Sequence, residues 1–439
     1  MKKFFSTIRN IFTIEDLRVR ILNTVGFLII FRLGSFVVLP GIDPSALPDK
    51  ADGIFGILDT MLGGAFSNAS IFGLGIMPYI SASIVIQLLT MAVPYFQKLQ
   101  KEGDSGRKKI NQITRVLTIA ITFAQGGAYL AASIPAEAII VENRFLFSVS
   151  SLTILTAGTI FCMWLGEKIT DKGIGNGISM LIMIGIISRF PGSLVQEAMT
   201  RGMSGALFFL LEIIGLFFVV MAVVLLTQAV RRIPVQYAKQ VVGNKVYGGQ
   251  RQYIPIKVNS AGVMPIIFAQ SLMFLPAMIA SYFAESSDIA NYVGNTFSNF
   301  MSWQYNLTFA IMIILFTFFY TAISVNPNQI ADDMKRNGGF IPGVKPGAAT
   351  SEFIDTVLTR VTFPGSLFLA IVAILPAFAQ MAGVSGNFAQ FYGGTSLLIM
   401  VGVILDTLQQ IESYLLMRHY EGMMKSGKVR GRSQNIAVA

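Results

Sequence analysis

The chain is short of the residue types that most enzyme centres use. Among its 439 residues there is one cysteine, Cys162, one histidine, His419, and only 13% of the residues are charged. A single cysteine excludes an intramolecular disulfide and a cysteine-based metal site. A single histidine, which we place in a solvated tail, excludes Ser-His-Asp and histidine-metal chemistry from the apolar interior of the protein. We therefore expect no enzyme activity.

Nucleotide-binding motifs are also missing. The glycine-rich run 173–177 resembles a phosphate loop, but no strand precedes it and no Lys-Ser/Thr pair follows at the required spacing. The run predicts the start of a helix instead. We expect no cofactor and no bound metal.

Apolar residues, in contrast, are abundant. Hydrophobic types make up 53% of the chain, and uncharged apolar runs of about 20 residues, the length of a membrane-spanning helix, recur throughout. We predict an all-α polytopic membrane protein with ten spans. They cover residues 21–39, 71–93, 113–134, 147–166, 176–190, 205–229, 259–284, 306–325, 363–382 and 395–417.

The first 20 residues imitate a signal peptide. Its apolar region is interrupted by the charged residues Arg9, Glu15 and Asp16 before it reaches the length of a signal-peptide core, and no small-residue cleavage site follows. We therefore predict that the segment is not cleaved. Its apolar residues share one helical face, which favours an amphipathic helix on an anionic membrane surface. A disordered basic tail is the alternative.

Lys and Arg segregate to one side of the membrane when all ten spans are counted. Of the 33 basic residues, only Arg32, Lys50, Arg144, Arg189 and Arg201 fall elsewhere. The positive-inside rule then places both termini in the cytoplasm. The fifth span, 176–190, is barely long enough alone, but omitting it would scramble this segregation.

Two long cytoplasmic loops, 228–258 and 326–362, are rich in Gly, Pro and basic residues. We interpret them as docking surfaces, with a role in topology alone as the alternative. In the first loop, 245–247 and 252–256 alternate around Gly248-Gly249 and predict a β-hairpin. Ribosomal RNA or an acidic protein surface would suit the net charge of +10.

Two pairs of segments repeat across the chain midpoint. Residues 75–80 are echoed by 262–267, and 177–185 by 394–402. With five spans in each half, an odd number, the two halves must be inverted in the membrane. We expect the divisions 1–20, 21–190, 191–417 and 418–439 for the amphipathic segment, the first half, the second half and the cytoplasmic tail.

The pathway between the halves should be apolar. The spans show neither a coupling-ion site nor a selectivity filter, whereas both repeats carry isoleucine at equivalent positions. An isoleucine constriction excludes ions by dewetting and fits chemically varied cargo, which suits an unfolded polypeptide. The alternatives are an inverted-repeat secondary transporter of a small solute, and an insertase or scaffold without a through-pore.

Residues 53–64 are too short to span a bilayer and too apolar for a solvated loop, so they should be buried inside protein in front of the second span. Several longer motifs follow. They are residues 75–83, 101–110, 163–170, 173–179, 340–343 and 393–399. Together these segments resemble the bacterial SecY family, the pore-forming subunits of the Sec protein translocon.

The resemblance implies two inverted five-helix halves around a central pore in the bacterial cytoplasmic (inner) membrane. The channel would pass unfolded secretory polypeptides across and release membrane segments sideways into lipid. The pore ring carries over to Ile76, Ile80, Ile178, Ile182, Ile267 and Ile399. A re-entrant plug at 53–70 includes Ile54, Phe55, Ile57, Leu58, Met61, Leu62, Gly63 and Gly64. The lateral gate carries over to Ser81, Ser83, Ser271, Leu275 and Pro276.

The resemblance also implies partners: SecE and SecG, the SecA ATPase, the ribosome, polypeptides that bear signal sequences, and membrane lipid. The docking residues are Arg231, Arg232, Lys239, Arg251, Lys335, Arg336 and Lys345. One position departs from the family, whose second loop usually reads Gly-Ile-Arg-Pro-Gly at its tip. Lys345 keeps the charge of that arginine but not its planar bidentate fork, so an arginine-type contact does not carry over.

Overall fold

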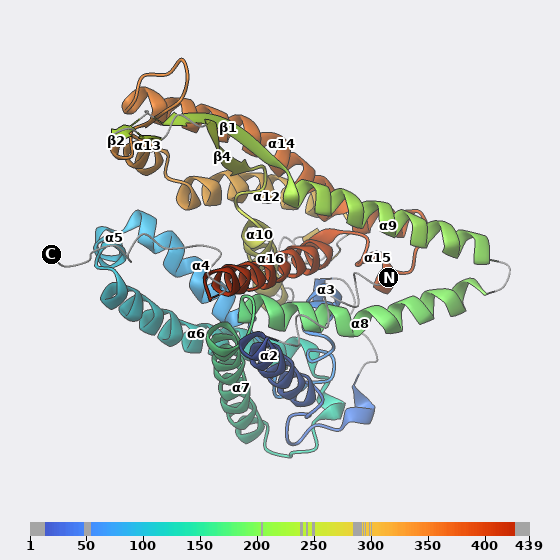
Figure 1. Ribbon diagram of the computed structural model, residues 1–439. Helices are drawn as coiled ribbons and strands as arrows, with labels where there is room; N and C mark the ends of the chain where they lie inside the picture. The colour runs from blue at the N-terminus through green and yellow to red at the C-terminus, as the bar shows by residue number, and fades with distance from the viewer. Residues whose placement is uncertain are drawn as a thin grey trace. The chain divides into compact units, whose positions relative to one another are not determined.

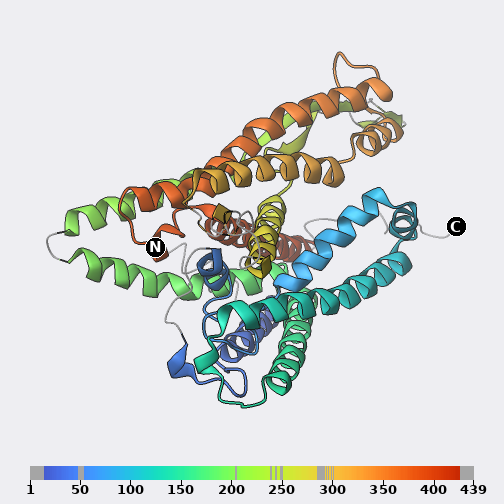
Figure 2. The same ribbon diagram turned by 180° about the vertical axis from the view of Figure 1, so that it is seen from behind.

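A computed structural model describes residues 14–47, 54–202, 205–237, 240–242, 245–247, 251–283, 292, 294, 296–297, 299 and 301–425 (Figures 1 and 2). Residues 1–13 of the predicted amphipathic segment 1–20 and residues 426–439 of the predicted tail 418–439 lie outside the described residues. The chain divides into two compact units. The first comprises Met1–Asp49, Met61–Ile187 and Val403–Ala439, and the second comprises Lys50–Thr60 and Ser188–Gly402.

A helix occupies each of the ten predicted positions. These helices are α2 (Glu15–Gly34), α4 (Met77–Ala92), α6 (Asp104–Ser133), α7 (Arg144–Lys172), α8 (Gly177–Arg201), α9 (Ala206–Gln228), α10 (Met264–Phe283), α12 (Trp303–Ser324), α14 (Ala348–Met381) and α16 (Gly394–Lys425). Within the described residues, six helices are each long and apolar enough to cross a membrane, and the bent helix pair 77–90 and 94–101 makes a seventh if it is counted as one span. The predicted all-α polytopic class is confirmed.

In the first unit, α4 packs on α6, and α7 packs on both α6 and α2. Aromatic rings join this core. Phe72 stacks between Phe31 of α2 and Phe161 of α7, with ring centroids 5.8 Å apart on each side. Gly34 is required beside this stack, because a Cβ there would lie 2.0 Å from the Phe72 ring. Cys162 is fully buried on α7.

In the second unit, α12 packs against α10 and α14. Its buried face repeats every fourth residue, as one side of a helix does. The buried residues are Tyr305, Phe309, Ile313, Thr317 and Thr321. Thr317 and Thr321 donate hydrogen bonds of 2.6 and 2.7 Å to the carbonyl oxygens four residues earlier, so both hydroxyls are satisfied without a partner helix.

The second predicted span, 71–93, is wrong at its start. Residues 71–76 form consecutive turns, and α4 begins only at Met77. Gly75 has φ +50°, which a helix cannot continue through. Pro78 lies in the first turn, where its missing N–H costs nothing. At the other end α4 is followed by α5 (Pro94–Lys101), at an angle of 97° to it.

The internal repeat has matching local structure. Gly75 with φ +50° stands two residues before Met77, where α4 begins, and Gly262 with φ +66° stands two residues before Met264, where α10 begins. The second repeat likewise begins α8 at Gly177, and Asn176 accepts hydrogen bonds from the first amides of that helix. The glycine-rich run therefore starts a helix, as predicted.

Several helices extend beyond their apolar runs. The fifth span reaches from 177 to 201 instead of ending near 190, and α16 continues to 425, into the predicted tail. The predicted loop 326–362 is also largely regular, since it contains α13 (Pro327–Arg336), β5 (Gly339–Phe340) and the first turns of α14. Hydropathy detects only the apolar part of a helix that crosses the lipid, so it does not predict the helical turns that project beyond the membrane.

The predicted hairpin of 245–247 with 252–256 is wrong. β3 (Lys245–Tyr247) pairs with β2 (Gln240–Val242), and β4 (Arg251–Lys257) pairs antiparallel with β1 (Val230–Tyr237). In the sequence, Gly243-Asn244 between β2 and β3 is a two-residue hairpin signal that competes with the later glycine pair. Gly243-Asn244 and Gly248-Gly249 both lie outside the described residues. β5 also pairs with β1, which makes the three-stranded sheet β4-β1-β5.

Candidate functional site

Four predicted pore residues lie in the first unit, in two pairs one helical turn apart. The amide of Ile80 donates a 3.1 Å hydrogen bond to the carbonyl oxygen of Ile76 where α4 begins. Ile178 and Ile182 have the same spacing on α8. Residues four apart share a helical face. Ile76, Ile80 and Ile182 expose 3%, 6% and 4% of their surface, and Ile178 is half-buried.

The other two predicted pore residues lie in the second unit, Ile267 on α10 and Ile399 on α16, and both are buried. The chain just before α10 approaches α16 closely, because a Cβ on Gly402 of α16 would lie 2.6 Å from Cγ2 of Val263. Each unit therefore carries buried isoleucines on the helices that hold the repeats. A ring that unites all six remains a proposal.

The predicted plug is a short helix followed by turns. α3 covers Ile54–Met61, and the chain then turns at Gly63 and Gly64, whose φ angles are +64° and +93°. Met61 and Leu62 are almost fully buried. The side chains of the other predicted plug residues lie outside the described part. They are Ile54, Phe55, Ile57 and Leu58.

Side chains of the first unit fix the turns that follow α3. Arg32 Nη1 donates a 2.5 Å hydrogen bond to the carbonyl oxygen of Gly63, and the Tyr129 hydroxyl donates one of 2.7 Å to that of Phe66. Ser70 pairs with Val38 in an isolated antiparallel bridge. A charge within a membrane span requires such partners, and Arg32 was one of the five basic residues that departed from the charge segregation.

Two contacts in the second unit hold the last turn of α3, and sequence reasoning missed both. Arg189 of α8 lies 2.5 Å from the carboxylate of Asp59, and the Thr60 hydroxyl donates a 2.5 Å hydrogen bond to Gln390 Oε1. Arg189 was another departure from the charge segregation. An arginine on the side of the membrane opposite to most basic residues was the signal in the sequence, although it did not indicate which carboxylate pairs with it.

Three of the predicted lateral-gate residues are half-buried serines on two helices, one in each unit. Ser81 and Ser83 lie on α4, where Ser83 accepts a 3.3 Å hydrogen bond from Gln87 Nε2. Ser271 lies on α10. The side chains of Leu275 and Pro276, also on α10, lie outside the described part.

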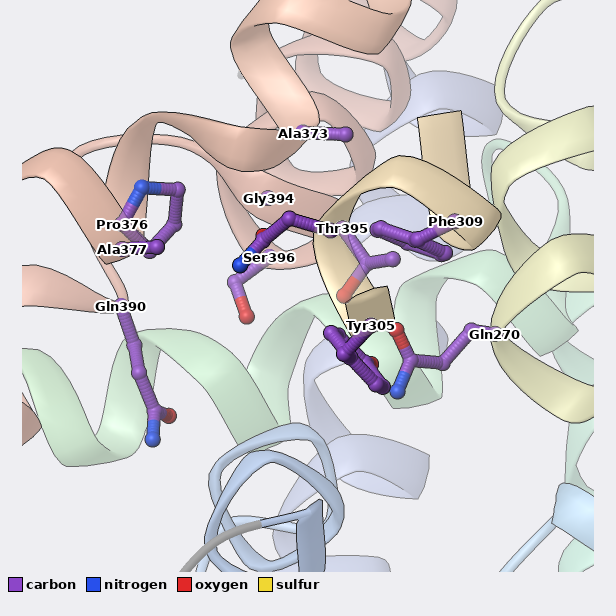
Figure 3. Close-up of a pocket in the computed structure, with 11 residues that line it drawn as sticks. Gln270, Tyr305, Phe309, Ala373, Pro376, Ala377, Gln390, Gly394, Thr395 and Ser396 are labelled. Atoms are coloured by element: carbon purple, nitrogen blue, oxygen red, sulfur yellow. The ribbon is translucent and has the colours of Figure 1, made fainter. Parts of the chain in front are cut away.

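A cavity of about 40 Å³ lies in the second unit, enough for one or two waters. Gln270, Tyr305 and Gln390 line it with apolar neighbours from α12 and α14 (Figure 3). Gln270 Nε2 and the Tyr305 hydroxyl are buried without a hydrogen-bond partner among the described residues. The signal for Gln270 was a polar side chain inside an apolar span.

The two predicted docking loops form one small domain of the second unit. β1, β4, β5, α13 and the start of α14 enclose an apolar core that includes Ile233, Val235 and Ile354. Alternating burial along β1 turns Ile233 and Val235 inward and leaves neighbouring residues in solvent. The two loops therefore fold together around one core.

Basic side chains cover this domain. Arg231 and Arg232 on β1 and Lys335 and Arg336 on α13 are exposed. Lys345 is exposed at a tip that turns at two glycines of positive φ. Lys239 lies outside the described residues, as does the side chain of Arg251, whose backbone pairs with Gln236 in the β1–β4 ladder.

The fold is that of a polytopic helical membrane protein, with buried isoleucines on its repeated helices and a basic domain built from its loops. These features are together typical of channel-forming membrane proteins. A family model described as SecY matches residues 70–408. The chain belongs to the SecY family. A protein translocase subunit SecY from Streptomyces scabiei is 42% identical over 94% of this chain and 98% of its own length, and one from Halalkalibacterium halodurans is 44% identical over 96% and 100%.

Solved structures agree in fold. One described as a protein-conducting channel has a TM-score of 0.65 and 17% identity, over 90% of this chain and 92% of its own. Sec61 in a canine ribosome–channel complex has a TM-score of 0.61 and 16% identity over the same shares. The comparisons do not support the secondary-transporter alternative.

Proposed function

We propose that this chain is the channel through which unfolded secretory polypeptides cross the bacterial cytoplasmic membrane, with both termini in the cytoplasm. Membership of the SecY family, with near full-length likeness to translocase subunits, carries the proposal. The isoleucines support it, because buried apolar side chains without a fixed charge can close a pore to ions and still accommodate varied cargo.

Three elements divide the work of the channel in this proposal. Ile76, Ile80, Ile178, Ile182, Ile267 and Ile399 form the pore ring between the halves 21–190 and 191–417. The segment 53–70 is the plug. Ser81 and Ser83 face Ser271, Leu275 and Pro276 across a lateral gate through which signal sequences and membrane segments reach lipid.

The channel is passive in this proposal, and a partner supplies the energy. The basic domain binds the SecA ATPase or the ribosome, while SecE and SecG complete the complex. Exposed arginines on a folded domain support this assignment, since arginine pairs bidentately with phosphate and carboxylate groups. The chain has no enzyme activity of its own.

Partner binding combined with transport tests the proposal. The purified complex in liposomes should bind ribosomes or SecA and take up a secretory precursor when SecA and ATP are present. A small-solute transporter would instead accumulate solute under an ion gradient and bind neither partner. Partner binding without precursor uptake would indicate an insertase or scaffold.

The plug and the gate have separate tests. Deletion of residues 57–65 should raise ion leak through the purified channel in planar bilayers, and unchanged conductance would count against the plug. Ser81→Cys with Leu275→Cys should crosslink and block secretion, while buried Cys162 stays unmodified. Undiminished export after efficient crosslinking would refute the gate assignment.

A further inference from the structure

The last turn of α3 is bonded to two different elements of the second unit. Asp59 faces Arg189 of α8, with Oδ2 2.5 Å from Nη2, and only 11% of the Asp59 side chain is exposed. Thr60 is the next residue, and its hydroxyl donates to Gln390 Oε1 at 2.5 Å. Two successive side chains of α3 therefore contact residues near the two ends of the long segment Ser188–Gly402 of the second unit.

Gln390 belongs to a segment that is itself tied down. It follows α15 (Gly386–Ala389), and Arg201 of α8 donates a 2.5 Å hydrogen bond to the carbonyl oxygen of Gly383, before that helix. The Ser385 amide donates to Glu197 Oε2 at 3.1 Å. Glu197 and Arg201 form an ion pair of 3.1 Å on α8. The segment is thereby anchored to the helix that also carries Arg189.

A second set of contacts anchors the far end of this segment to α9. Arg201 Nη2 lies 2.5 Å from Glu212 Oε1, and the Tyr392 hydroxyl donates to the Glu212 carbonyl oxygen. Burial raises the pKa of Tyr392, so its hydroxyl keeps the proton that it donates. Arg189 and Gln390 consequently lie on one frame of elements that these contacts hold together, and α3 is bonded to that frame.

α3 depends on this frame for its position. Its eight residues are fewer than the roughly 12–15 at which an isolated helix becomes marginally stable in water. Its closing carboxylate is largely removed from solvent, and a buried carboxylate is costly without a cation and hydrogen bonds. The pair Asp59–Arg189 and the bond Thr60–Gln390 therefore determine where the helix ends.

We propose that Arg189 and Gln390 are positioning residues that latch the plug helix in the closed channel, through Asp59 and Thr60. The inference rests on the proposed role of 53–70 as the plug, and adds which side chains hold it. Release of α3 then requires separating the Asp59–Arg189 pair and the Thr60–Gln390 bond, while the Arg201 network stays intact.

Ion conductance of the purified channel in planar bilayers, without polypeptide, tests the latch. Arg189→Gln should raise resting conductance roughly tenfold, the order expected on losing a charged hydrogen bond, and Thr60→Val should raise it less. Arg115→Gln is the matched control, because it breaks an ion pair to Glu167 of 2.7 Å at a surface site. It should leave conductance unchanged.

Two further variants separate latching from folding. Asp59→Asn removes the charge from the other partner and should leak like Arg189→Gln. Asp59→Arg combined with Arg189→Asp restores opposite charges and should return conductance towards that of the parent. A leak that this exchange does not reduce, or one that matches a fall in thermal stability across the variants, would overturn the latch.

Deletion of residues 57–65 distinguishes failure of the latch from failure of the plug. If the deletion leaks while Arg189→Gln and Asp59→Asn do not, the plug stands and the latch is refuted. If the deletion does not leak either, the plug assignment fails and the latch fails with it. Leak in the deletion and in both latch variants supports both proposals.

Discussion

Tyr129 of α6 reaches the turns after the plug helix and donates a 2.7 Å hydrogen bond to the carbonyl oxygen of Phe66. Its ring also packs on the Phe66 ring, with centroids 4.7 Å apart. Both side chains are buried. One tyrosine thus supplies a polar and an apolar contact to a segment that has no regular secondary structure of its own.

Tyr129→Phe separates the two contacts. The phenylalanine keeps the ring packing and removes the hydroxyl, so the free energy of unfolding should fall by about 1 kcal/mol. The Phe66 carbonyl oxygen still accepts from the Ala69 amide at 3.2 Å, which limits the loss. The midpoint of thermal unfolding in detergent measures it. Tyr95→Phe, at a residue with 58% exposure, should leave the midpoint unchanged.

Gly185→Ala should displace the segment after α3. A Cβ on Gly185 would lie 2.2 Å from the carbonyl oxygen of Met61, a backbone atom that cannot rotate away. We expect a loss of roughly 1–3 kcal/mol, as for other overpacked sites, together with increased ion leak. Gly192→Ala on the same helix meets nothing within 4 Å and is the control. Equal behaviour of the two variants would contradict this packing.

The repeated glycines allow a paired test. Gly75→Ala and Gly262→Ala should each cost about 1–2 kcal/mol, because both have positive φ. Gly75→Ala should cost more, since its Cβ would also lie 2.4 Å from Leu62 Cδ2, whereas Gly262 has no neighbour within 4 Å. Thermal unfolding of both variants checks the order. A larger loss at Gly262 would show that the local backbone differs from that described.

Arg231 and Arg232 should contribute to partner binding without contributing to stability. Both are exposed on β1. If the partner is ribosomal RNA, each substitution by alanine should lower the slope of log binding constant against log salt by about one, with no change in unfolding. Arg144→Ala, also exposed but on the opposite side of the predicted topology, is the control. An unchanged slope with weaker binding would favour a protein partner.

The sequence predicted the positions of the helices well because a bilayer imposes a length and polarity that can be read locally. It failed where geometry overrides hydropathy. Residues 71–76 are apolar but turn, since Gly75 needs a positive φ. The first turns of α14 are polar but helical, since they pack on the small domain instead of lipid.

The site was predictable as a set of apolar residues, but not as a set of contacts. Isoleucines at repeated positions were visible in the sequence, while Asp59–Arg189 and Thr60–Gln390 join residues 130 and 330 positions apart, which one sequence cannot pair. Departures from the charge segregation were the closest signal. Arg32, Arg189 and Arg201 each proved to bond to a carbonyl or a carboxylate.

The threonines of α12 have a consequence for movement. Because Thr317 and Thr321 bond to carbonyls of their own helix, no hydrogen bond from these hydroxyls to a neighbouring helix has to break if α12 shifts along its packing face. The same holds for Thr114, Thr118 and Thr122 of α6. These threonine hydroxyls therefore add no polar contact between helices, and the helices can slide or part without exposing a broken hydrogen bond from them to lipid.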